Sequence, residues 1–111
     1  MYYDAKEYIR RICEKTDPEV FLSLLQEECA ELSHAISKLL RATNTVYAPT
    51  PVSERQALDM VREEITDVQM MTDGVLFLFF GIEPGSDDMR DETLERAKWV
   101  RWLKRLEEDD E

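Results

Sequence analysis

The sequence predicts an all-α fold, in which a four-helix bundle spans residues 1–106 and an acidic tail follows at residues 107–111. Apolar residues recur three and four positions apart, without the sustained alternation that marks strands. The composition, 43% hydrophobic and 35% charged with only 3 Gly and 4 Pro, is typical of a folded, helix-rich protein. A chain of 111 residues has room for one hydrophobic core, which predicts a single domain.

The first two predicted helices are separated by the segment Thr16-Asp17-Pro18. The first helix covers about residues 4–15, and the second runs from Pro18 to about Ala42. Asp17 can cap the second helix, and Pro18 fits its first turn because that position needs no backbone N–H. Local turn chemistry therefore supports the boundary that periodicity suggests.

A loop without periodicity follows at residues 43–52, and its 44–51 part is either a plain connector or a mobile lid. Residues 53–56, Ser-Glu-Arg-Gln, form a capping-box pattern that begins a third helix, which we expect to end near Gly81. A break that contains glycine and proline follows at residues 81–85. It leads to an arginine-rich fourth helix, whose expected N-cap is Ser86, Asp87 or Asp88.

The net charge of −11 argues against binding to duplex nucleic acid, since such binding depends on a basic surface. The N-terminal residues lack a basic segment followed by an apolar one. The longest apolar run, residues 75–80, is much shorter than the ~20 residues that a membrane helix needs. Cys13 and Cys29 are isolated thiols, to which we assign no chemistry. These observations predict a cytoplasmic protein without duplex or membrane partners.

Two acidic residues of the second predicted helix lie where apolar residues are expected. At 100° per residue, most large apolar side chains of this helix fall in one arc, which we expect to face the core. Glu28 falls inside this arc and Glu31 on its border, whereas Glu27 and His34 lie on the solvent side. Burying a lone ionised carboxylate costs several kcal/mol, so Glu28 needs a compensating charge.

The third predicted helix repeats this arrangement, with Glu64 inside its apolar arc and Asp67 on the border. Each acid follows its counterpart in the second helix by 36 positions. Four converging carboxylates repel one another unless cations compensate, and the candidates are Lys38, arginines of the fourth helix, or a divalent metal. Donors that are all oxygen favour Mg²⁺, with Mn²⁺ as a substitute, over Zn²⁺. Buried salt bridges to arginine at a subunit contact are the structural alternative.

The segments Glu27-Glu28-Cys29-Ala30-Glu31-Leu32 and Glu63-Glu64-Ile65-Thr66-Asp67-Val68 resemble the E-x-x-E and E-x-x-D signature of the all-α nucleoside triphosphate pyrophosphohydrolases, above all the MazG-like branch. The resemblance covers roughly residues 21–80 and extends to Lys38, which matches a lysine that MazG-like sequences often carry after the second acid. Thr66 stands where the family commonly has glycine. The resemblance implies a MazG-like helical bundle that assembles as a homodimer or homotetramer.

The resemblance also implies a reaction, the Mg²⁺-dependent hydrolysis of a (deoxy)nucleoside triphosphate between its α- and β-phosphates, which gives the monophosphate and pyrophosphate. We choose Glu28 as general base, because its place in the apolar arc predicts a raised pKa. Lys38 is expected to contact a phosphate as the second catalytic residue. Lys98 and Arg101 are similar to basic family residues near the substrate phosphates. The implied metal ligands are Glu28, Glu31, Glu64 and Asp67.

Base recognition is not assigned from the sequence. The aromatic residues that could stack on a base, or belong to the core or an interface, are Phe21, Tyr47, Trp99 and Trp102. Oligomerisation is expected because residues 75–80 are apolar all round their helix, with Phe77 and Phe80 facing away from the core arc.

Two alternatives to this enzyme stay open. A diiron carboxylate bundle uses E-x-x-H pairs, and Glu31 with His34 satisfies that spacing once. The second copy is missing, since Met70 stands where its histidine should be. A non-catalytic helical module that binds a nucleotide or another protein is the other alternative, and as an interaction module it predicts no effect of metal.

Overall fold

The computed structural model of the protein describes residues 5–43 and 52–109. This part of the chain contains helices and no strand, which confirms the all-α prediction. The elements are α1 (Ala5–Glu14), α2 (Pro18–Ala42), α3 (Glu54–Phe80), the short 3-10 helix η1 (Asp87–Met89) and α4 (Glu92–Asp109).

The predicted boundaries of the first three helices are accurate to within about one residue. Asp17 occupies the N-cap position of α2 and Pro18 its first turn, although the Asp17 side chain makes no capping hydrogen bond. The capping box of α3 is confirmed, because the Gln56 N–H donates to Ser53 Oγ at 3.2 Å and the Ser53 N–H donates to Gln56 Oε1 at 2.9 Å. Gly81 ends α3 in the left-handed conformation, with φ of 66°.

The fourth helix begins later than the sequence suggests. Ser86 precedes the 3-10 helix and not α4, and the chain is extended at Arg90 before α4 starts. The residue that caps α4 is Asp91, whose Oδ1 accepts a hydrogen bond from the Leu94 N–H at 3.0 Å. At its other end α4 continues to Asp109, so the expected tail begins inside the helix, in keeping with the good helix propensity of glutamate.

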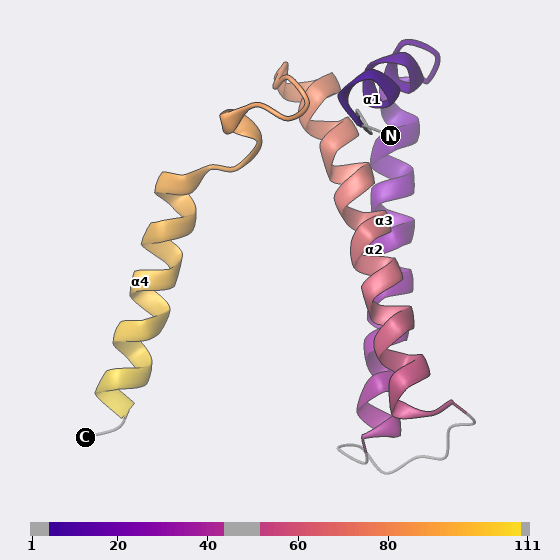
Figure 1. The fold of residues 1–111 in the computed structure, drawn as a ribbon. Coiled ribbons are helices and arrows are strands. Elements are labelled where there is room, and N and C mark those ends of the chain that lie inside the picture. Colours follow the sequence, from indigo (N-terminus) through magenta and orange to yellow (C-terminus); the bar gives the residue numbers. More distant parts are fainter. Residues whose placement is uncertain (1–4, 44–51, 110–111) are drawn as a thin grey trace.

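Helices α2 and α3 pack side by side as an antiparallel hairpin, and α1 lies across the end of the hairpin where α2 begins and α3 ends (Figure 1). The buried apolar residues of the described chain are few: Cys13, Phe21, Ala35 and Ala57. Phe21 lies against Gly74 of α3, where a Cβ atom would be 2.2 Å from the ring. The absence of a side chain at Gly74 therefore lets the two helices approach closely.

Helix α4 stands apart from the other three helices (Figure 1). The radius of gyration is 17.9 Å, against about 13 Å for a compact domain of this length. The accessible surface of 9144 Å² exceeds the ~6,400 Å² typical of a monomer of this mass. Within this chain, then, three helices pack together and α4 does not complete a bundle with them. None of the described helices combines the length and apolar character that crossing a bilayer requires.

The apolar arcs of α2 and α3 are only partly used inside the chain. We expected each arc to face the core, but several of its members are exposed, and this expectation is wrong for them. They follow one another at spacings of seven and four residues on α2 and of seven and fourteen residues on α3, so they form a stripe on each helix. We call these residues the apolar face: Leu22, Cys29, Ile36 and Leu40 of α2 with Leu58, Ile65 and Phe79 of α3.

Both stripes of the apolar face lie on the same side of the hairpin. On each helix, the stripe is rotated about the helix axis by about 100° from the line that faces the neighbouring helix, and the sense of rotation is the same on both. Because the two helices are antiparallel, equal rotations place both stripes on the same side of the pair. Glu31 and Asp67 are rotated in the opposite sense. The hairpin therefore has one apolar side and one acidic side.

Candidate metal centre

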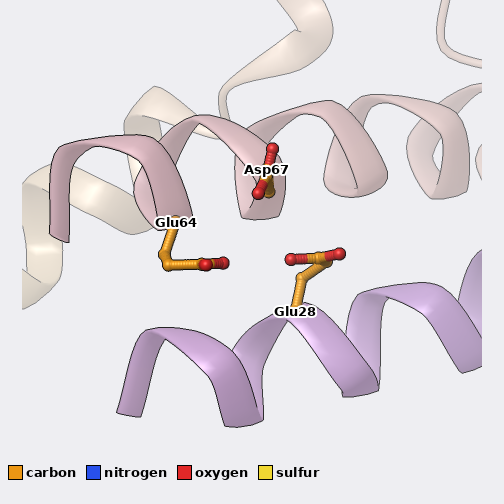
Figure 2. A group of neighbouring side chains, drawn as sticks. All are labelled: Glu28, Glu64 and Asp67. Carbon is orange, nitrogen blue, oxygen red and sulfur yellow. The ribbon is translucent and has the colours of Figure 1, made fainter. Parts of the chain in front are cut away.

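Three of the four predicted carboxylates meet between α2 and α3. Glu28 comes from α2, while Glu64 and Asp67 come from successive turns of α3 (Figure 2). One oxygen of each lies within 4.8 Å of the others, and all three side chains are half-buried. Oxygen donors around a single divalent cation are at most about 4–5 Å apart, so the spacing suits a shared cation.

The surroundings of Glu64 indicate that the cluster lacks a compensating positive charge. Its Oε2 atom is buried and has no hydrogen-bond partner among the described residues. Burial raises the pKa of Glu64, and so do a proton shared with Glu28 and the negative charges of Asp67, Glu28 and Glu31. The described ion pairs include none of these carboxylates. A hard cation fits this all-oxygen donor set and would remove the repulsion.

Glu31 occupies a different place from the other three acids. It is exposed and does not belong to the group of converging oxygens. Its charge still contributes to the raised pKa of Glu64, so it lies at the edge of the cluster. The four predicted ligands therefore divide into three that converge and one within electrostatic reach.

The predicted basic residues are dispersed. Lys38 is half-buried and follows Glu31 by two helical turns, about 10 Å along the acidic side of α2. Lys98 and Arg101 are exposed on α4, which stands away from the acids of its own chain (Figure 1). The structure brings neither of them to the cluster.

The predicted aromatic candidates also lie apart from one another. Trp99 and Trp102 are exposed on α4 and stack on each other, with ring centroids 5.7 Å apart and planes 8° from parallel. Phe21 is buried at the contact of α2 with α3. Tyr47 and the expected lid at residues 44–51 lie outside the described residues.

Histidine does not contribute to the carboxylate cluster. His34 is exposed, as expected for the solvent side of α2, and the converging group contains only carboxylates. Met70, which stands in place of a second histidine, is 54% exposed. The three carboxylates of the cluster suit a hard cation, and among the described residues the cluster lacks the histidine of an E-x-x-H pair.

Two half-buried polar residues were missed by the sequence argument. Arg41 is half-buried, and its Nε has no partner among the described residues. It follows Lys38 by three residues, a spacing that places both on neighbouring lines of α2. Asp73 is half-buried, and burial raises its pKa. Its helical phase lies outside the apolar arc of α3, so the signal that marked Glu28 and Glu64 does not mark Asp73.

The chain was compared with known proteins by sequence and by structure. No protein-family model, no curated protein and no solved structure matches it.

Proposed function

We propose that the protein is a Mg²⁺-dependent nucleoside triphosphate pyrophosphohydrolase of the MazG-like type. The observation that carries the proposal is the converging set Glu28, Glu64 and Asp67, in which a buried carboxylate oxygen has no partner among the described residues. The E-x-x-E and E-x-x-D pattern that supplies these residues supports the same assignment. Mn²⁺ is the expected substitute metal, and a cytoplasmic location stays a prediction.

In the proposed reaction, the oxygen of a water molecule forms a bond to the α-phosphorus, and the bond from this phosphorus to the oxygen bridging to the β-phosphate breaks. Pyrophosphate leaves with the bonding electrons, and the water proton passes to a carboxylate. Bound Mg²⁺ would neutralise phosphate oxygens and lower the pKa of the water. Glu28 is the proposed base, because it faces both α3 carboxylates, and Lys38 would contact the phosphates beyond Glu31.

The first test is pyrophosphate release from a panel of canonical and modified nucleoside triphosphates, in Mg²⁺ and in EDTA. We expect release only with metal, together with a monophosphate product. Glu64→Gln should abolish the release of pyrophosphate. Glu63→Gln is the matched control, since Glu63 is the exposed neighbour on the same helix. Release in EDTA, or equal loss in both variants, would contradict the proposal.

We also propose that two copies of the chain assemble through the apolar face. On α2, the middle of the apolar face carries no charged residue, although 35% of the residues in the chain are charged. Because like-charged copies repel least where neither carries a charge, this side of the hairpin suits a second copy. Two hairpins face to face would also make a four-helix bundle, with the acidic sides left outside.

The size of the face is sufficient for a stable dimer. Its residues span 18 positions of α2, about 27 Å, and two helices are about 20 Å wide. Each copy would then bury on the order of 500 Å² or more, which reaches the ~1,000 Å² in total that a specific interface needs. The surplus surface of the isolated chain is consistent with such burial.

A further inference from the structure

A second feature of the structure is a cavity between α1, α2 and α3. Its volume is about 600 Å³, within the range of ~300–1,000 Å³ that is usual for small-molecule sites. Its walls are mainly apolar, with Tyr8 and Ile12 from α1, Phe21 and Leu24 from α2, and Met71 from α3. Such walls suit a flat ring system and not a phosphate group.

Both helices of the hairpin lead from the carboxylate cluster into this cavity. On α2, Leu24 precedes Glu28 by four residues, and on α3, Met71 follows Asp67 by four. Residues four apart lie one above the other on a helix, so the cavity begins about 6 Å from the carboxylates. Thr66, the neighbour of Asp67, also lines it.

The positions of the charges fix the direction in which a nucleotide would lie. Lys38 is beyond the carboxylates in the other direction along α2, so the negatively charged β- and γ-phosphates belong on that side. With the α-phosphate at the carboxylates, the sugar and base would extend roughly one to two helical turns toward α1. This is where the cavity lies.

Among the described residues that line the cavity, one carries a carboxyl group, and this residue is Asp73. This group is half-buried and makes no hydrogen bond or ion pair with the described residues, although burial raises its pKa. A carboxylate accepts hydrogen bonds, so a ligand that donates N–H groups would satisfy it. The buried ring of Phe21, held against Gly74, forms part of the apolar wall.

We propose that this cavity binds the base of the nucleotide and that Asp73 selects bases with an exocyclic amino group. The inference rests on the proposed function, because the carboxylate cluster determines where the α-phosphate lies. Cytosine, adenine and guanine present such an amino group. Uracil and thymine present carbonyl oxygens in its place, which would face a carboxylate without a hydrogen bond.

The test compares cytidine and uridine triphosphates on the wild type, Asp73→Asn and Asp73→Ala, with Glu63→Gln as control. Turnover is followed by pyrophosphate release, and binding of CMP and UMP is followed by calorimetry in Mg²⁺. We expect the wild type and the control to prefer the cytosine compounds by at least about tenfold in kcat/KM and in affinity. Both Asp73 variants should lose this preference mainly through KM, with the helical circular dichroism unchanged.

The outcomes separate this inference from the proposed function. Turnover without a preference for the amino base, or a preference that survives in Asp73→Ala, would overturn the role of Asp73 and leave the enzyme assignment standing. Preferential binding of CMP without turnover of any triphosphate would support the base site and refute the activity. Absence of both turnover and binding would overturn both proposals.

Discussion

Replacing Ile36 with alanine should weaken the proposed dimer without unfolding the chain. Ile36 lies near the middle of the α2 stripe and is 42% exposed. Complete burial of an isoleucine contributes roughly 1.5–3 kcal/mol, so the exposed part would contribute about 0.6–1.3 kcal/mol per copy when it is covered. In a two-fold dimer the substitution acts twice, which gives about 1.3–2.5 kcal/mol, or a roughly 10- to 70-fold higher dissociation constant.

Val20→Ala provides the matched control for this experiment. Val20 is also 42% exposed and also lies on α2, but outside the apolar face. Sedimentation equilibrium over a range of protein concentrations measures both dissociation constants, and circular dichroism checks that each variant keeps its helices. A wild type that is monomeric at ~100 µM, or equal effects of the two substitutions, would refute the assignment of the interface.

Three further changes test the interior of the hairpin. Glu64→Gln should raise the thermal midpoint in EDTA, because it removes a repelling charge, and should remove the stabilisation by Mg²⁺ seen in wild type by scanning fluorimetry. Asp73→Asn should gain stability relative to wild type as the pH rises above about 4, because the raised pKa of Asp73 makes its ionised form unfavourable in the folded state. Urea unfolding should give the same free energy of unfolding for the variant and the wild type at pH 3, and a higher value for the variant at pH 7. Gly74→Ala should destabilise the chain by up to about 2 kcal/mol in urea unfolding, since its Cβ would lie 2.2 Å from Phe21 and overpacking outweighs the gain in helix propensity.

Helix boundaries were predictable because the residues that set them act locally. Pro18 fits a first turn in any context, and the reciprocal hydrogen bonds of Ser53 and Gln56 require only their own backbone. The start of α4 was misplaced because several residues with capping side chains follow one another, and Ser86 and Asp91 both precede helical turns. Residue type alone does not show which of these neighbouring residues caps the helix.

The convergence of the acids was predictable for a different reason. Helical phase placed Glu28 and Glu64 inside apolar arcs, and an antiparallel hairpin brings equal phases together, as the structure shows. Helical phase could not indicate how many neighbours an arc has, so it did not reveal that part of each arc stays exposed. The separation of α4 from the hairpin depends on the path of residues 81–91, which periodicity does not describe.

The two unsatisfied features of the isolated chain lie on opposite sides of the same two helices. On one side, a buried oxygen of Glu64 lacks a partner among the described residues, and on the other side, large apolar side chains face solvent. A cation and a second copy would therefore bind without competing for surface. A bound cation would stabilise the folded hairpin by mass action, by about 2.7 kcal/mol at a free concentration a hundredfold above its dissociation constant, and association with a second copy would act in the same direction. On these two proposals, the metal-free single chain is the least stable form of the protein.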